Sequence, residues 1–336
     1  MKKKIIIFLS IIAVIVIGLL INKIHKENVN KKEIESGIHA VVIANDVPFY
    51  KEPKTENVKQ IKTLKKSENV YILDEFTDNG IEWYKIKVDE KTNGYVRANT
   101  VLYHKEMNKE KLIATDVSEF NMGRNFENKE EFEVFLLEND ISYVYIRAGG
   151  RGYGSQGNFF EDKEVETYRQ ACEYLGIPYG YYFLDEALSS KEIDEEVQVI
   201  KDFLKSNKGN YNVLPLALDI EKHDGKGRAD DIWTDRAVLV QELIDDLDEE
   251  GIKTILYSNA QTASLYLSEL DTEFWLAYYP NVSTVPDYWY SDTTQPGAEN
   301  PNIIKKMIGW QFTENGAGDE IPNAVDISLF KKDFYK

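Results

Sequence analysis

The stretch Val213–Glu221, VLPLALDIE, decides how the rest of the chain is interpreted. Its apolar run has the length and composition of a buried β-strand, and two acids, Asp219 and Glu221, stand where that strand would end. Residues two apart in a strand face the same side, so both acids point the same way as Ala217, toward the inside of a barrel. This pattern predicts a site in which two carboxyl groups share one buried surface.

Similar strands recur on both sides of this stretch. Helical periodicity separates the first five of them, with amphipathic segments at 128–139, 162–175, 190–205 and 229–250. Repeated β–α units predict an α/β fold, and eight strands predict a closed (β/α)-barrel. Residues 281–306 show no helical period, so we expect the last helices to be irregular. A doubly wound open sheet is the alternative, but RAGGRGYGSQG lacks the spacing of a phosphate-binding loop. The predicted strands are KLIATDVSEF, SYVYIRAGG, IPYGYYFL, VLPLALDIE, KTILYSN, FWLAYYP, MIGWQFT and AVDISLF.

Acidic residues mark several strand ends, which is where barrel enzymes carry their chemistry. Neighbouring buried acids disfavour each other's ionisation, so one can stay protonated as a general acid while the other remains anionic. A pair of acids neutralised by a structural arginine, Arg147 or Arg228, is the alternative. The candidate catalytic residues are Asp116 at the first strand, Asp219 and Glu221 at the fourth, and Asp326 at the last.

Aromatic side chains lie in or at the ends of the same strands. Their faces suit the C–H faces of sugar rings, so their presence beside acids predicts a carbohydrate cleft. The candidate substrate-binding residues are Arg147, Tyr182, Tyr257, Trp275, Tyr278, Trp310 and Gln311.

The N-terminal residues 1–36 predict a membrane anchor and a tether. Three lysines precede the apolar run Ile5–Ile21, whose 17 residues would reach about 25 Å as a helix, the short end of a membrane span. No A-x-A pattern follows the run, which favours an uncleaved transmembrane helix over a signal peptide. Residues 22–36 are polar and lysine-rich, as expected of a tether.

Residues 37–104 predict a small all-β domain of about five short strands. The pairs Asn79-Gly80 and Asn93-Gly94 favour tight hairpin turns. The ending EWYKIKV…GYVRANTV resembles bacterial SH3-type domains, a family whose members often bind cell-wall peptides. In that family the residues matching Trp83, Tyr84, Gly94, Tyr95 and Val96 close the small barrel.

Composition excludes several classes of function. The 336 residues carry a net charge of −18, and residues 105–336, with 23 basic and 45 acidic side chains, carry −22, which opposes nucleic-acid binding. A single cysteine and four scattered histidines predict no disulfide, no metal site and no cofactor.

A cysteine peptidase using Cys172 and His223 is disfavoured because Cys172 lies in the helical stretch YRQACEYLG, where a packed thiol is expected. A metal-dependent deacetylase would need a group of histidines beside its acids, and the sequence has no such group.

The motifs ATDVSEFN, YVYIRAGGRGYGSQG, GIPYGYYF, PLALDIE, ILYSN, FWLAYY and GWQFTENGAG…VDIS stand in the order found in glycoside hydrolase family 25. The resemblance covers residues 112–336, within a predicted catalytic domain at 109–336. It implies that Glu221 is the proton-donating acid, that Asp219 is its strand partner, and that Asp116 and Asp326 complete the set. Tyr182, Trp275 and Trp310 match cleft aromatics, whereas LDEA at Leu184–Ala187 departs from the family pattern.

The resemblance implies a lysozyme that hydrolyses the β-1,4 bond after N-acetylmuramic acid in peptidoglycan glycan strands. Asp219 lies too close to Glu221 along the strand to act as a remote nucleophile, which favours substrate-assisted catalysis; a direct nucleophile, Asp116 or Asp326, stays open. A catalytically weak wall-binding or assembly module of an envelope-spanning machine, such as a conjugation apparatus, is the alternative function. Since this substrate lies outside the cytoplasm, we expect a single-pass protein of the cell membrane with an extracytoplasmic catalytic domain, or a secreted form after cleavage.

Overall fold

The protein is described here by a computed structural model that covers residues 37–336 apart from 106–110, 224, 281, 283, 288, 291–299, 318–320, 322–324 and 333. These residues form two compact units that divide between Tyr103 and His104. The predicted anchor Ile5–Ile21 and the tether 22–36 lie outside the described residues. Among the helices that the structure does describe, none is long and apolar enough to span a membrane.

The smaller unit is an antiparallel sheet of seven strands in the order β3-β2-β6-β5-β4-β1-β7. Alternate side chains of these strands fill one core, which includes Val42, Phe49, Ile86 and Val96. Its resemblance to SH3-type domains stays a prediction. The elements are β1 (Ile38–Val42), β2 (Val47–Tyr50), β3 (Gln60–Leu64), β4 (Asn69–Asp78), β5 (Ile81–Asp89), β6 (Thr92–Arg97), η1 (Ala98–Thr100) and β7 (Val101–Leu102).

The two Asn-Gly pairs of this unit have different roles. Asn79 and Gly80 form the β4–β5 turn with φ values of 52° and 77°, as the sequence predicts. The second prediction is wrong, because Gly94 lies inside β6 and the β5–β6 turn falls between Asp89 and Thr92. A Cβ atom at Gly94 would lie 2.4 Å from the carbonyl oxygen of Tyr50, so glycine is needed there for the close approach of β2.

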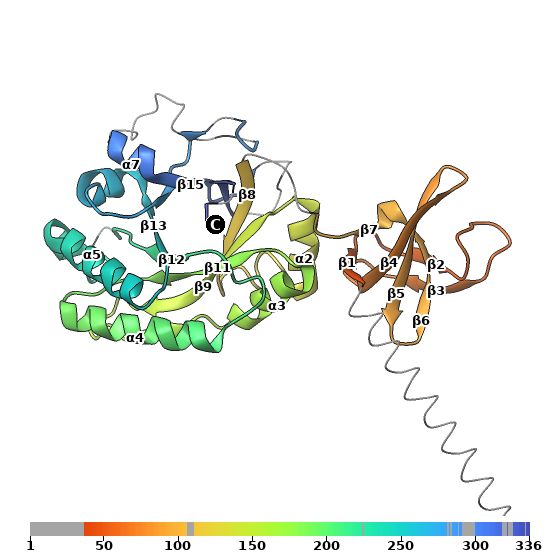
Figure 1. The fold of residues 1–336 in the computed structure, drawn as a ribbon, viewed down its shortest axis with the longest axis horizontal. Coiled ribbons are helices and arrows are strands. Elements are labelled where there is room, and N and C mark those ends of the chain that lie inside the picture. Colours follow the sequence, from red (N-terminus) through yellow and green to blue (C-terminus); the bar gives the residue numbers. More distant parts are fainter. Residues whose placement is uncertain are drawn as a thin grey trace, which may run out of the picture. The chain divides into compact units, whose positions relative to one another are not determined.

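The larger unit is a closed, mixed β-barrel of eight strands (Figure 1). The strand order is β9-β11-β12-β13-β14-β15-β16-β8, and the β8–β9 pairing closes the ring. The short β10 (Phe159–Glu161) folds back antiparallel onto β9. The barrel strands are β8 (Lys111–Val117), β9 (Tyr143–Arg151), β11 (Tyr179–Leu184), β12 (Leu216–Asp219), β13 (Thr254–Asn259), β14 (Phe274–Ala277), β15 (Met307–Thr313) and β16 (Asp326–Lys331).

The predicted (β/α)-barrel is therefore wrong, although each predicted strand segment contains a strand. The last strand, β16, runs antiparallel to both β15 and β8, whereas the other pairings around the ring are parallel. A parallel return needs a crossover, usually a helix, and the connection from Thr313 to Asp326 contains no helix among its described residues. Without that crossover the chain turns back and pairs in the opposite direction.

Among the described residues, the long helices lie between β8 and β13 and cover the outer side of the barrel (Figure 1). Two begin at side-chain caps, where Asn128 accepts from the amide of Glu131 at 2.9 Å and Ser189 from that of Glu192 at 3.4 Å. The remaining connections carry short turns. The long helices are α2 (Lys129–Glu138), α3 (Val165–Leu175), α4 (Ser190–Ser206) and α5 (Trp233–Glu249); the short elements are η2 (Asp230–Ile232), α6 (Ala260–Thr262), η3 (Ala263–Leu267) and α7 (Pro301–Lys306).

Aromatic rings fill the barrel interior. Trp275 stacks on Tyr145 with ring centroids 4.9 Å apart and packs against Phe330 at 5.3 Å. The indole N–H of Trp275 donates to the hydroxyl of Ser328 at 2.9 Å, which satisfies its one polar atom in the core. Ala217 belongs to the same cluster, so β12 turns this face inward.

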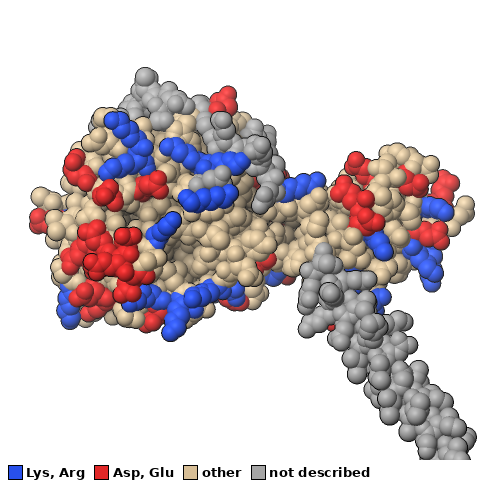
Figure 2. Space-filling model, in the orientation of Figure 1, with Lys and Arg blue, Asp and Glu red and all other residues tan. Residues whose placement is uncertain are grey.

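Acidic charge is concentrated on the helical side of the barrel unit. Figure 2 shows acidic side chains gathered over α5, where the charges of Glu242, Asp245 and Glu249 act on Asp246. These groups stand on the outer helices, so they contribute net charge without shaping the barrel mouth.

We expect a fragment beginning at Lys109 to fold alone, because side chains of that unit supply the interior of the barrel. In scanning calorimetry its unfolding transition should coincide with one transition of the full chain, and a fragment spanning 37–104 should account for another. A 109–336 fragment that lacks a cooperative transition would contradict this independence.

Candidate active site

A cavity of about 260 Å³ opens at the carboxyl ends of the barrel strands. It gathers all four acids that the sequence singles out. Its lining residues are Asp116, Tyr182, Asp219, Glu221, Tyr257, Trp275, Tyr279, Gln311, Glu314 and Asp326.

The strand register brings the acids together from three parts of the barrel. Asp116 of β8 and Asp326 of β16 are direct partners across an antiparallel pair. Asp219 ends β12, which lies three strands from β8 around the ring, and Glu221 follows two residues later. Segments that are about 100 residues apart in the chain thus meet at one mouth.

Gln311 is the polar centre of the cavity. Its amide nitrogen donates to Asp116 at 3.0 Å, and its amide oxygen accepts from the hydroxyls of Tyr257 at 2.8 Å and Tyr279 at 2.7 Å. Because both tyrosines donate to the amide oxygen, the nitrogen must face Asp116. The network fixes the carboxylate without a cation.

Asp116 and Asp326 share a proton. Burial raises the pKa of Asp116 to about 6, against hydrogen bonds from Gln311 and Asp326 that lower it. Burial, followed by the charges of Asp116 and Glu314, raises the pKa of Asp326 to about 9. Asp326 therefore keeps its proton at neutral pH and donates it in the hydrogen bond to Asp116.

Asp219 and Glu221 form the second acidic pair. Burial and then the charge of Glu221 raise the pKa of Asp219, while burial and then the charge of Asp116 raise the pKa of Glu221 to about 7. The pair consequently retains a proton near neutrality. The Oδ1 atom of Asp219 is buried and has no hydrogen-bond partner within the described part of the chain, so it is open to a donor from a ligand.

The two arginines that might have neutralised these acids pair elsewhere. Arg147 binds Asp162 at 2.7 Å and Glu119 at 3.2 Å. Arg228 makes two contacts of 2.9 Å with Glu192. Arg147 lowers the pKa of Asp219 from a distance but does not line the cavity, so its predicted contact with substrate has no support in the cavity lining.

The predicted aromatic residues divide into two groups. Tyr182, Tyr257 and Trp275 line the cavity. Tyr278 and Trp310 do not: the buried indole of Trp310 donates to the carbonyl of Tyr278 at 2.8 Å, and both rings pack against Tyr290. Their prediction as cleft residues is at odds with this packing.

Sequence reasoning missed Tyr279 and Glu314. Strand alternation carries the signal for the first, because Trp275, Ala277 and Tyr279 are spaced by two and Tyr278 falls on the other face. Glu314 follows directly on β15 and has no comparable pattern. The Leu184–Ala187 departure has a structural role, since buried Asp185 lies 2.6 Å from Arg236.

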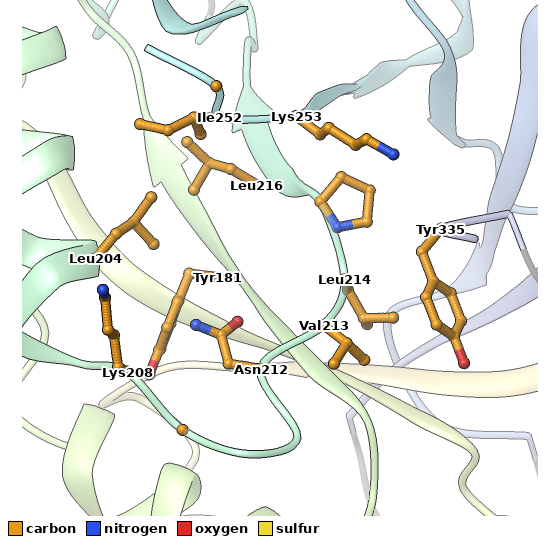
Figure 3. A pocket seen from close by; sticks show the side chains of 13 residues that line it. Tyr181, Leu204, Lys208, Asn212, Val213, Leu214, Leu216, Ile252, Lys253 and Tyr335 are labelled. Carbon is orange, nitrogen blue, oxygen red and sulfur yellow. The ribbon is translucent and has the colours of Figure 1, made fainter.

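Two further features, Cys172 and a second cavity, offer no catalytic group. Cys172 is buried in α3, and burial raises the pKa of its thiol, which disfavours the reactive thiolate. A second cavity of about 530 Å³ lies at the opposite end of β12 and β13 (Figure 3). Its lining includes Leu204, Lys208, Leu214 and Lys253 but no carboxyl side chain, so it offers no acid for catalysis.

A barrel with paired acids at its mouth defines a glycoside hydrolase, and the comparisons identify its type. The family model of Glycosyl hydrolases family 25 matches residues 115–321, more than half of the chain, so the chain belongs to that family and is a lysozyme-type glycoside hydrolase. No curated protein matches it.

Solved structures share the fold at low sequence identity. The spore cortex lytic enzyme SleM of Clostridium perfringens is 22% identical, with a TM-score of 0.52 over 68% of this chain and 70% of the other. The catalytic domain of endolysin ply40 from bacteriophage P40 of Listeria monocytogenes is 20% identical, with a TM-score of 0.50 over 68% of this chain and 96% of the other.

The raised pKa of Glu221 makes stability depend on pH. An acid whose pKa is about 7 in the folded state and near 4.5 in the unfolded state binds more protons when folded, so it lowers stability as pH rises from about 4 to 7. Glu221→Gln removes this penalty, and we expect the variant to be more stable than wild type at pH 8 by on the order of 1–3 kcal/mol.

Urea unfolding at pH 4 and pH 8 measures this difference, which should vanish at pH 4. Glu269→Gln, at an exposed position, is the matched control and should behave as wild type at both values. A Glu221→Gln variant with the same advantage at both pH values would refute the assignment of a raised pKa.

Proposed function

We propose that the chain cleaves the β-1,4 bond between N-acetylmuramic acid and N-acetylglucosamine in peptidoglycan. The convergence of four carboxyl groups with Tyr182, Tyr257 and Trp275 in one cavity carries this proposal. Acids supply the proton transfer that a glycosidic bond needs, and aromatic faces suit pyranose rings. Membership of family 25 supports peptidoglycan as the substrate class.

Glu221 is the general acid of the proposed reaction. A carboxyl with a pKa of about 7 is substantially protonated at neutral pH and still gives up its proton readily. It protonates the glycosidic oxygen as the bond from that oxygen to the anomeric carbon breaks. As a carboxylate, it then takes a proton from the attacking water.

Asp219 holds the substrate's acetamido group. Its unpartnered Oδ1 atom accepts the amide N–H while the acetamido carbonyl oxygen bonds to the anomeric carbon, which yields an oxazolinium ion. Water opens this ring and leaves the product with retained configuration. The Asp116–Asp326 pair positions the sugar; its protonated state argues against Asp326 as a nucleophile.

We expect Glu221→Gln to reduce the release of reducing ends from peptidoglycan by about 10²–10⁴-fold, because glutamine cannot deliver the proton. Asp219→Asn should lower the rate by on the order of 10²-fold, since it removes the charge that stabilises the cationic intermediate. Circular dichroism checks folding, and nuclear magnetic resonance of the first product reads its anomeric configuration. A Glu221→Gln enzyme that keeps a tenth of the wild-type rate, or an inverted product, contradicts the scheme.

We further propose that the β-rich unit at 37–104 adds affinity for the cell wall. Its adjacent acids, Asp74-Glu75 and Asp89-Glu90, are all exposed, and its ten basic and ten acidic side chains balance. This leaves binding or spacing as its contribution, with wall peptides as the ligand class that the SH3-type resemblance implies.

The catalytic unit should act outside the cytoplasm, since its proposed substrate is found there. Protease added to intact protoplasts should degrade the unit while a cytoplasmic marker protein survives. Recovery of the unit in the medium would show that it is released, and its protection in intact protoplasts would contradict this localisation.

A further inference from the structure

Exposed aromatic side chains gather at the barrel mouth. Four aromatic residues of the described barrel unit are strongly exposed: Phe120, Tyr153, Tyr211 and Tyr279. Phe120, Tyr153 and Tyr279 follow the carboxyl ends of β8, β9 and β14, around the acidic cavity. Tyr153, at 45% exposure, does not line that cavity and has no part in the reaction derived above.

The loop that carries Tyr153 is held in shape by its own hydrogen bonds. It joins β9 to β10, and the amide of Gly152 donates to the carbonyl of Asn158 at 3.0 Å. The amide of Gly157 donates to the carbonyl of Gly154 at 2.8 Å, and Arg151 donates to the carbonyl of Gly157 at 3.0 Å. A loop tied at three points presents its aromatic side chain without large ordering entropy on binding.

Tyr153 lies against the loop that carries the general acid. Its ring centroid is 4.6 Å from that of His223, two residues after Glu221, at an interplanar angle of 60°. The amide of His223 in turn donates to Asp230 at 2.9 Å, which fixes this loop. Burial and then the charges of Asp219, Glu186 and Glu221 raise the pKa of the Tyr153 hydroxyl, consistent with a position beside the cleft.

The strand order places Tyr153 across the mouth from Tyr279. In the ring of eight, β9 and β14 are four strands apart, so these tyrosines flank the acids from opposite sides. Tyr279 is already tied to the cavity through Gln311, whereas Tyr153 stands farther out. A glycan that crosses the acids and continues past β12 toward β9 would reach the Tyr153 ring.

We propose that Tyr153, backed by His223, is a binding platform for a sugar unit beyond the two that flank the cleaved bond. Part of the Tyr153 ring stays open to solvent although His223 packs against it, and sugar C–H groups pack on exposed aromatic faces. The charges of Asp219, Glu186 and Glu221 near Tyr153 disfavour an anionic ligand, which favours a neutral N-acetylglucosamine unit of the glycan over a phosphate polymer. This inference rests on the proposed function, because it assigns a further part of the same substrate.

The test compares the cleavage of two peptide-free peptidoglycan glycans: the disaccharide N-acetylmuramyl-N-acetylglucosamine, which fills only the two positions that flank the bond, and the octasaccharide. For Tyr153→Ala we expect the ratio of kcat/KM on the long glycan to that on the short one to fall about fivefold, the loss of one aromatic contact. Tyr153→Phe should keep the wild-type ratio, since the ring face is retained. Tyr211→Ala is the matched control, because Tyr211 is similarly exposed but lies at the other end of β12.

Binding without turnover separates this inference from the proposed reaction. In titration calorimetry the octasaccharide should bind Glu221→Gln about fivefold more tightly than the Glu221→Gln/Tyr153→Ala double variant. If wild type cleaves neither glycan yet this difference persists, the platform stands and the proposed hydrolysis fails. If Tyr153→Ala lost kcat/KM equally on both glycans, Tyr153 would have a role in holding the Glu221 loop. If it lost none on either glycan, Tyr153 would have no role in the cleft. Each of these results overturns the proposed platform.

Discussion

The antiparallel pairing of β16 with β8 is the constraint on which the barrel and its site depend. It closes a ring that would otherwise expose two strand edges, and it sets Asp326 directly opposite Asp116. Two carboxyl groups on paired strands cannot both ionise in a buried site, so one proton remains between them. The same pairing that completes the fold therefore also determines the charge of the site.

Uncharged groups, not cations, stabilise this acidic mouth. Gln311 turns its nitrogen to Asp116 because two tyrosine hydroxyls occupy its oxygen. Arg147 is held by Asp162, and Arg228 by Glu192 of α4. A cation among these carboxyls would lower their pKa values and remove the proton that acid catalysis needs. Keeping arginine at a distance thus preserves the acidity of the cavity.

The sequence predicted the strands and the four acids well because both rest on local pattern. A buried strand appears in the sequence as an apolar run, and an acid in or at the end of such a run is exceptional. Asp116, Asp219 and Asp326 could therefore be identified from the sequence alone. The direction of β16 could not be predicted in this way, because it depends on the connection from Thr313 to Asp326, whose described residues contain no crossover helix. Tyr278 and Trp310 are predicted as cleft residues because aromatic content alone does not show which face of a strand a ring occupies. The Gln311 network joins residues of three strands, and no local pattern encodes it.

Since β16 is the barrel strand synthesised last, neither the ring nor the acidic mouth can form before residues 326–331 have emerged. Until then β8 and β15 each have one unpaired edge. Asp116 also lacks Asp326, the protonated partner that donates a hydrogen bond to it. A polypeptide whose β16 has not yet emerged from the ribosome therefore has half a site. Hydrolytic competence depends on the arrival of this one strand.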